Sequence, residues 1–177
     1  QGGLDMGTPA LAYYASDFPL TQVVVDYPWS TIDELLWVVP KLIDKNPLLK
    51  AEWEKNNVVP LSWGALPPYG VVTTKGAGTL SALKGCKIRV WGQYMPMFMI
   101  RLGTIPVSMP SSATYEAMAK GTVDCTLSPP DQHRALGLHE VAKNHIVGDF
   151  APALLAAQPM MNAQQFHKLA PDLQKVF

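Results

Sequence analysis

Runs of apolar residues separated by polar, glycine- and proline-containing segments predict an alternation of short strands and helices. In the first half of the chain, strands are expected at residues 23–25, 58–63 and 71–74. Residues 31–43 carry apolar side chains at helical spacing, and Pro40 is expected to kink or end that helix. Asn46 followed by Pro47 predicts the N-cap and the first residue of another helix.

The second half repeats this alternation more regularly. Strands are expected at residues 87–90, 105–107, 122–124, 146–150 and 154–161. Helices are expected at residues 94–102, 112–120, 131–138, 140–144 and 162–169. Ser112 is the predicted cap of one helix, and Asn162 with Gln165 forms a predicted capping box for another. The alternation predicts an α/β fold with mainly parallel sheets.

Composition narrows the class of protein. Hydrophobic residues make up 48% of the 177 positions and charged residues 16%, which is enough to fill a core and excludes disorder. The 14 basic and 14 acidic side chains balance, so no overall charge favours nucleic acid or an anionic membrane. No apolar run approaches the roughly 18 residues of a spanning helix. Residues 1–5 do not resemble a natural start and residues 171–177 resemble the beginning of a helix, so we expect a fragment.

Cysteine and histidine spacing gives no metal motif. Cys86 and Cys125 lack metal-ligand spacing; each fits a core as a small apolar residue, and a disulfide between them stays open. His139-Glu140 begins like a zinc-protease motif, but the position of the second histidine is occupied by Lys143. These histidines are therefore interpreted as surface residues.

Other catalytic patterns are incomplete. The glycines at 76–78 lack the remainder of a phosphate-binding loop, so a plain loop is expected. Ser111 and Ser112 stand outside any Gly-x-Ser-x-Gly elbow. Asp124 is expected at a strand end, where α/β folds bind ligands, but backbone N–H groups could equally satisfy it. An α/β enzyme that uses Asp124 or His133 remains an alternative, although the required motifs are missing.

Arg89 differs because it lies inside a short apolar strand, between Ile88 and Val90. A guanidinium there is costly unless it is paired, and its planar fork matches a carboxylate. Spacing alone leaves three readings open: an internal salt bridge, a position at the rim of a short strand, and an anchor for an anionic ligand.

Short motifs follow one another along the whole chain: GLDM at 3–6, FPL at 18–20, LKGCKIRV at 83–90, LGTIPV at 102–107, MP at 109–110, YEAM at 115–118, GTVD at 121–124, EV at 140–141 and PDLQ at 171–174. In this order they resemble the substrate-binding receptors of tripartite ATP-independent periplasmic (TRAP) transporters, the dicarboxylate-receptor (DctP-type) family. Each motif is weak alone, but so many in one order are specific.

The resemblance implies two α/β lobes of the periplasmic-binding-protein type, joined by crossing hinge strands and closing on a ligand. Residues 1–66 and 154–177 would form an incomplete lobe one, and residues 67–153 would form lobe two. It further implies a periplasmic, non-enzymatic receptor that feeds membrane TRAP subunits, with its signal segment missing. No cofactor is expected, although a metal ion bridges ligand and protein in some relatives. A binding module of another transport or sensing system is the alternative.

The resemblance also implies which residues bind the ligand. Arg89 matches the arginine that pairs with the ligand carboxylate. Ser128 stands where sialic-acid-binding members carry an asparagine, and Tyr69 stands near their second arginine. Ser111 could add a contact through its hydroxyl or N–H. Aromatic residues that could line the cleft are Trp91, Tyr94, Trp63, Tyr13 and Tyr14. If two or more do so, a monocarboxylate with an apolar body is expected.

Overall fold

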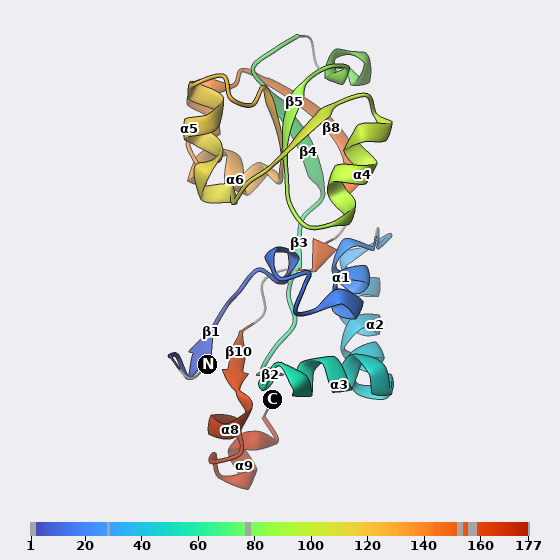
Figure 1. Ribbon diagram of the computed structural model, residues 1–177, viewed down its shortest axis with the longest axis vertical. Helices are drawn as coiled ribbons and strands as arrows, with labels where there is room; N and C mark the ends of the chain where they lie inside the picture. The colour runs from blue at the N-terminus through green and yellow to red at the C-terminus, as the bar shows by residue number, and fades with distance from the viewer. Residues whose placement is uncertain (1–2, 28, 77–78, 152–153, 156–158, 177) are drawn as a thin grey trace. The chain divides into compact units, whose positions relative to one another are not determined.

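The chain forms two compact units in a computed structural model that describes residues 3–27, 29–76, 79–151, 154–155 and 159–176 (Figure 1). Unit 1 comprises Gln1–Leu66 and Leu154–Phe177, and unit 2 comprises Pro67–Ala153. The chain therefore leaves unit 1 once and returns to it once. The assignment of these units to the two lobes of a receptor stays a prediction.

Unit 1 is built mainly of helices with short antiparallel strands. Its elements are β1 (Met6–Gly7), η1 (Leu11–Tyr13), α1 (Pro19–Asp26), α2 (Ile32–Lys45), α3 (Pro47–Lys55), β2 (Val58–Pro60), β3 (Ala65–Leu66), β9 (Leu154–Leu155), β10 (Met160–Asn162), α8 (Ala163–Phe166) and α9 (Pro171–Gln174). Strands β1, β10 and β2 form a sheet in that order, and β3 pairs with β9. The segment expected at residues 58–63 is thus a strand only over its first half.

The strand predicted at residues 23–25 is wrong, because these residues belong to helix α1. Pro19 occupies the first turn, where its missing N–H costs nothing. The backbone N–H groups of Leu20 and Thr21 donate to the carboxylate of Glu52 at 2.7 and 2.8 Å. A cap supplied from 31 residues away overrides the β propensity of the three valines.

The next two helices follow the sequence prediction more closely. Helix α2 continues past Pro40 instead of ending there. The Asn46 side chain accepts from the N–H groups of Leu48 and Leu49 at 3.0 and 3.3 Å, which confirms the predicted cap of α3. Leu49 and Trp53 are both buried, so the predicted shared face of this helix is also confirmed.

Unit 2 contains a five-stranded sheet flanked by helices. Its elements are β4 (Tyr69–Thr73), η2 (Leu80–Leu83), β5 (Lys87–Val90), α4 (Tyr94–Arg101), β6 (Ile105–Ser108), η3 (Ser111–Ala113), α5 (Thr114–Ala119), β7 (Cys125–Ser128), α6 (Pro130–Ala135), α7 (Leu138–Val141) and β8 (Asn144–Ala151). Helix α4 packs against β5 and β6. A cluster from β4, α5, α7 and the segments after these helices comprises Val72, Met118, Val123, Leu138 and Ala142.

The α/β class is confirmed for unit 2, but the expectation of mainly parallel sheets is wrong. The strand order is β6-β5-β7-β4-β8, with β5 parallel to β6 and β7. Strand β4 runs antiparallel to β7 and β8, and the pairings within unit 1 are antiparallel as well. Alternating helices and strands do not specify the direction in which a strand returns to its sheet. The mixture of parallel and antiparallel pairs could therefore not be predicted from the sequence pattern.

Two local predictions in unit 2 are also corrected. Ser112 does not cap a long helix, because it lies within η3 and α5 begins at Thr114 without a side-chain cap. The strand expected at 122–124 begins later, at Cys125. The N–H groups of Thr122 and Val123 donate back to Ala117 at 2.8 and 3.2 Å, so both residues complete the end of α5.

Gly70 fixes the geometry at one end of the sheet. The register between β4 and β8 shifts at this point, and Gly70 lies opposite Ser128 on β7. A Cβ added at Gly70 would collide with the His145 ring and lie 2.8 Å from the carbonyl oxygen of Ile146. Only glycine permits this close approach. The antiparallel pairing with β7 places Tyr69, the first residue of β4, at the same edge as the end of β7.

Candidate functional site

Arg89 lies in the interior of the unit 2 sheet. Its strand, β5, pairs with β6 on one side and β7 on the other, where Arg89 is opposite Val107 and Thr126. The residue is only 4% exposed, and its Nε–H donates to the carbonyl oxygen of Met109 at 3.0 Å. The predicted strand is confirmed, and the reading that placed Arg89 at a solvent-facing rim is wrong.

Two of the predicted aromatic residues lie in a row with this guanidinium. The Trp91 ring is 4.9 Å from Arg89 Cζ, and the Tyr69 and Trp91 ring centroids are 5.4 Å apart with their planes tilted by 46°. Trp91 is 7% exposed and Tyr69 is 5% exposed. The structure therefore brings three predicted site residues together in a buried stack, Tyr69–Trp91–Arg89.

This stack lies at one edge of the sheet. Trp91 directly follows β5, Ser128 ends β7, and Tyr69 begins the antiparallel β4. The carboxyl ends of β5 and β7 therefore coincide with the start of β4, and the carboxyl ends of strands are where open α/β sheets bind ligands. Ser128 is buried and its hydroxyl donates to the Pro129 carbonyl at 3.3 Å. Ser111 lies in η3, two residues after the carbonyl that Arg89 contacts.

The other aromatic candidates have separate surroundings. Tyr13 and Tyr14 belong to unit 1 and are about half-exposed, at 45% and 46%. Trp63 packs edge-to-face on Trp53, with the ring centroids 5.7 Å apart, so it belongs to the aromatic packing of unit 1. Tyr94 begins α4 and is exposed. A ligand contact by any of these residues stays a prediction.

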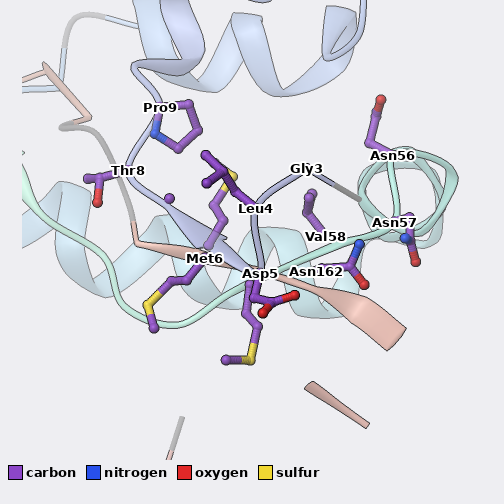
Figure 2. Close-up of a pocket in the computed structure, with 13 residues that line it drawn as sticks. Gly3, Leu4, Asp5, Met6, Thr8, Pro9, Asn56, Asn57, Val58 and Asn162 are labelled. Carbon is purple, nitrogen blue, oxygen red and sulfur yellow. The ribbon is translucent and has the colours of Figure 1, made fainter. Parts of the chain in front are cut away.

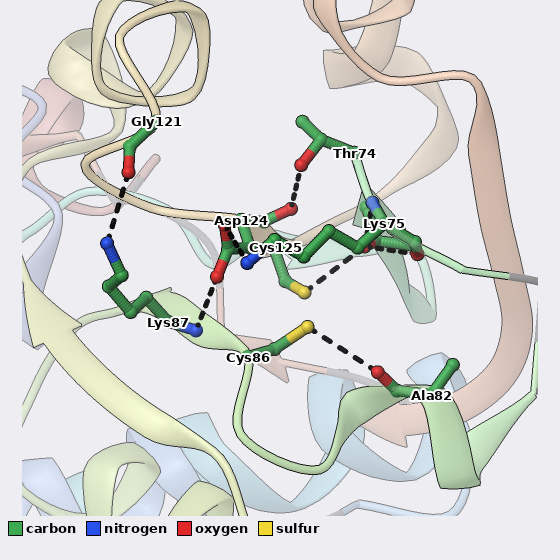
Figure 3. A network of polar contacts seen from close by, with 9 residues as sticks. Thr74, Lys75, Ala82, Cys86, Lys87, Gly121, Asp124 and Cys125 are labelled. Carbon is green, nitrogen blue, oxygen red and sulfur yellow. Dashed lines mark hydrogen bonds and ion pairs between the residues drawn. The ribbon is translucent and has the colours of Figure 1, made fainter.

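Asp124 directly precedes β7, at the opposite end from Ser128, and Figure 3 shows the polar network around it. Its carboxylate pairs with Lys75 Nζ at 2.8 Å and accepts from the Lys87 N–H at 3.1 Å. Burial alone would raise the pKa of Asp124, but Lys75 and the N–H of Lys87 outweigh it and hold the pKa below its ordinary value. The reading of Asp124 as an internally satisfied aspartate is therefore confirmed, and the expected strand-end position is wrong because Asp124 precedes the strand.

The two cysteines lie beside this network as free, buried thiols. Cys86 Sγ contacts the Ala82 carbonyl and Cys125 Sγ contacts Thr73 Oγ1, at 3.5 and 3.3 Å. Burial, followed by the neighbouring Cys86, raises the pKa of the Cys125 thiol. A thiol held in its neutral form is a packing group and a poor nucleophile.

A pair of histidines near Ser128 was not foreseen. The His133 and His145 rings lie edge-to-face at 4.6 Å, and His133 Nε2 is 3.2 Å from the Ser128 carbonyl oxygen. Burial, followed by the charge of His145, lowers the pKa of His133. The two residues come from α6 and β8, and no local pattern predicts that they meet.

The histidines singled out by sequence do not form a metal site. His139 is exposed, and the carboxylate of Glu140 accepts from the Tyr115 hydroxyl at 2.9 Å, which raises the pKa of Tyr115. Among the residues that the structure describes, no group of three or more histidine, cysteine, aspartate or glutamate side chains could hold a metal ion. Within the same residues, no helix is both long and apolar enough to cross a membrane.

Unit 1 contains a cavity of about 500 Å³ between its first residues, β10 and the turn before β2 (Figure 2). Several polar groups around this cavity make hydrogen bonds within unit 1. The Asp5 carbonyl accepts from the Asn162 N–H at 2.9 Å, and Asn162 Oδ1 accepts from the N–H groups of Gln164 and Gln165. The predicted cap at Asn162 is thus confirmed, but its own N–H is bonded to Asp5 instead of the expected Gln165 side chain. This cavity shows no cluster comparable to the stack around Arg89.

Comparison with known proteins identifies the fold family. The family model of bacterial extracellular solute-binding proteins, family 7 (DctP), matches residues 1–177. The chain belongs to this family. A solute-binding protein of Albidiferax ferrireducens is 27% identical over 185 residues, which cover 97% of this chain and 51% of the relative. The chain thus spans about half the length of the relatives that it matches.

Solved structures give the same result. The Bordetella pertussis extracytoplasmic solute receptor DctP7, which binds pyroglutamic acid, superposes with a TM-score of 0.80 at 21% identity, over 99% of this chain and 57% of its own. A TRAP solute-binding protein of Rhodoferax ferrireducens was solved in complex with copurified benzoate. It gives a TM-score of 0.78 at 25% identity, and the match covers 99% of this chain and 55% of that receptor's chain. These matches confirm the α/β fold class of the two-lobed receptors. DctP proteins are solute-binding receptors of TRAP transport, and not a family of enzymes.

Proposed function

We propose that the protein is an extracytoplasmic receptor that captures a small organic carboxylate and delivers it to the membrane subunits of a TRAP transporter. Arg89 is the proposed partner of the carboxylate. The observation that carries this proposal is the placement of Arg89, buried at the centre of a sheet and held in one orientation by the Met109 carbonyl. An arginine fixed in this way is preorganised for an anion.

The geometry suggests how the carboxylate would bind. A carboxylate would meet the planar fork of N–H groups on the guanidinium, whose geometry suits a bidentate pair. The low-dielectric surroundings of β5 would strengthen this ion pair. Several related receptors are recorded with carboxylates, including pyroglutamic acid, galacturonate, 3-hydroxybenzoate and benzoate. One relative was solved with 2-amino-1-propanol, so an acidic ligand is not universal in the family.

Calorimetry of the purified protein against a panel of organic acids tests the proposal. We expect at least one monocarboxylate to bind with a micromolar or lower dissociation constant, about −8 kcal/mol or better. Arg89→Ala should abolish this binding. Arg101→Ala is the matched control, because Arg101 is an exposed arginine in the last turn of α4 in the same unit. Equal affinity in the Arg89→Ala and Arg101→Ala proteins would refute Arg89 as the anchor.

Delivery to a transporter needs a separate test. Cells that carry the cognate TRAP membrane subunits but lack the receptor should take up the acid only when this protein is supplied. Uptake should be lost with Arg89→Ala and retained with Arg101→Ala. Binding without any receptor-dependent uptake would instead indicate a sensing role for the same site.

A further inference from the structure

Trp91 touches both of the other members of the buried stack. Its ring lies over the guanidinium of Arg89 and contacts the ring of Tyr69 on the same edge of the sheet. The proposed anion anchor and an aromatic surface are thus parts of one continuous structure. A ligand whose carboxylate meets Arg89 would have the rest of its body next to these two rings.

We propose that this stack selects the class of ligand: a monocarboxylate with a flat, apolar body, such as an aromatic acid, over a polyhydroxylated sugar acid. The inference rests on the proposed function of Arg89 as the carboxylate anchor. Aromatic faces gain dispersion and offset-stacking energy from a planar apolar partner. The ring faces themselves offer no strong hydrogen bonds to a row of hydroxyl groups, and each hydroxyl buried against them without a partner costs free energy.

The hydroxyl groups on the neighbouring strand support the same selection. Thr126 lies opposite Arg89 on β7, and its Oγ1 donates to the Leu127 carbonyl at 3.1 Å. Ser128 ends the same strand, and its Oγ donates to the Pro129 carbonyl at 3.3 Å. Both hydroxyl protons are therefore donated to backbone carbonyls, one within β7 and one directly after it. A polyhydroxylated ligand would have to break these bonds to gain a donor from either side chain.

Trp91 has a second role as a positioning residue for Arg89. A guanidinium stacked on an indole gains about 0.5–2 kcal/mol and has its plane restricted. The Met109 carbonyl holds Nε while the indole lies against the guanidinium carbon, so two contacts restrict the movement of this group. Removal of the indole should therefore weaken the binding of every carboxylate somewhat and the binding of aromatic carboxylates most.

The test compares three probes on the purified protein by calorimetry: benzoate, cyclohexanecarboxylate and D-gluconate. Benzoate and cyclohexanecarboxylate share a carboxylate and a six-membered ring, but only benzoate is flat. We expect benzoate to bind at least tenfold more tightly than cyclohexanecarboxylate, and D-gluconate to bind weakest. Tighter binding of D-gluconate than of benzoate overturns the inference.

Variants separate this inference from the proposed function. Trp91→Leu should reduce the preference for benzoate over cyclohexanecarboxylate to about threefold or less, and Trp91→Phe should retain most of it. Trp37→Leu is the control, because Trp37 is an exposed tryptophan on α2 of unit 1. If Arg89→Ala abolishes binding while Trp91→Leu leaves the preference unchanged, the anchor stands and the aromatic selection fails. If Arg89→Ala has no effect, the proposed function itself fails.

Fluorescence provides a readout that does not depend on the stability of Trp91→Leu. Benzoate binding should change the tryptophan emission of the wild-type protein, and this change should be clearly smaller in Trp91→Phe, which preserves an aromatic ring. A change of equal size in wild type and Trp91→Phe would show that the ligand does not approach Trp91 and would overturn the inference.

Discussion

The Nε–H of Arg89 donates to the carbonyl oxygen of Met109, which lies 20 residues further along the chain. This bond joins the centre of β5 to the segment between β6 and η3. A lysine carries a methylene group where this nitrogen lies, so it cannot make the same bond. The arginine is thus both a tether between two segments and the proposed anchor for the ligand.

Arg89→Lys should therefore weaken carboxylate binding despite keeping the positive charge. An ammonium group offers neither the planar fork nor the Nε donor that fixes its direction. We expect a loss of about 10- to 100-fold, or about 1.4–2.7 kcal/mol, in calorimetric titrations. Arg101→Lys serves as the exposed counterpart and should leave the affinity unchanged. Wild-type affinity in Arg89→Lys would show that charge alone, without direction, is sufficient.

Asp124→Asn should destabilise unit 2. The wild-type carboxylate is buried, pairs with Lys75 and accepts from the Lys87 N–H. We expect a loss of about 1–3 kcal/mol in the free energy of unfolding, measured by urea denaturation at neutral pH. Glu116→Gln is the comparison, because it breaks an exposed ion pair with Lys120 and should cost about 0.5 kcal/mol or less.

The same aspartate predicts a pH dependence. The pKa of Asp124 is lowered in the folded protein. Its contribution to the free energy of unfolding is therefore complete above the ordinary carboxyl pKa of about 3.9. The contribution is lost as the pH falls through the lower, folded-state value. The difference in stability between wild type and Asp124→Asn should therefore be constant near neutral pH and shrink below about pH 4. A difference that stays constant down to pH 2 would contradict the ion-pair account.

Glu52→Ala should destabilise unit 1 by removing the cap of helix α1. Its carboxylate accepts from two backbone N–H groups and from the Thr21 hydroxyl, whose oxygen in turn accepts from the Trp53 indole at 3.0 Å. We expect a loss of about 2–4 kcal/mol in urea denaturation. Glu52→Gln keeps one acceptor oxygen and should lose less. Glu54→Ala, an exposed position on the same helix, should change the stability little; a similar loss there would point to an effect of helix charge.

Local signals in the sequence were sufficient where the determining residues are neighbours. The pair Asn46-Pro47 predicted the start of α3, and the apolar run around Arg89 predicted β5. The helix over 23–25 was missed because its cap comes from Glu52, on another helix. Only contacts between distant segments decide such cases.

The candidate site, too, was predictable from sequence only where the residue type itself carries the information. The ordered motifs identified Arg89, and the structure places Trp91 and Tyr69 beside it as a continuous stack. The Met109 carbonyl could not be found from sequence, because any residue type supplies a backbone oxygen. Strand β4 brings Tyr69 to this edge because it runs antiparallel to β7, and the close approach of β8 at Gly70 is open only to glycine.

His133→Gln should reduce the loss of stability that the protein undergoes in mild acid. The pKa of His133 is lowered by burial and then by His145, although the Ser128 carbonyl and Asp131 favour the charged ring. The unfolded chain therefore binds a proton more readily, and stability should fall as the pH drops below about 6.5. Urea denaturation between pH 5 and pH 8 measures this slope, which should be shallower in His133→Gln than in wild type, with the exposed His167→Gln protein as the control. Identical slopes in wild type and His133→Gln would remove the histidine pair as a source of acid sensitivity.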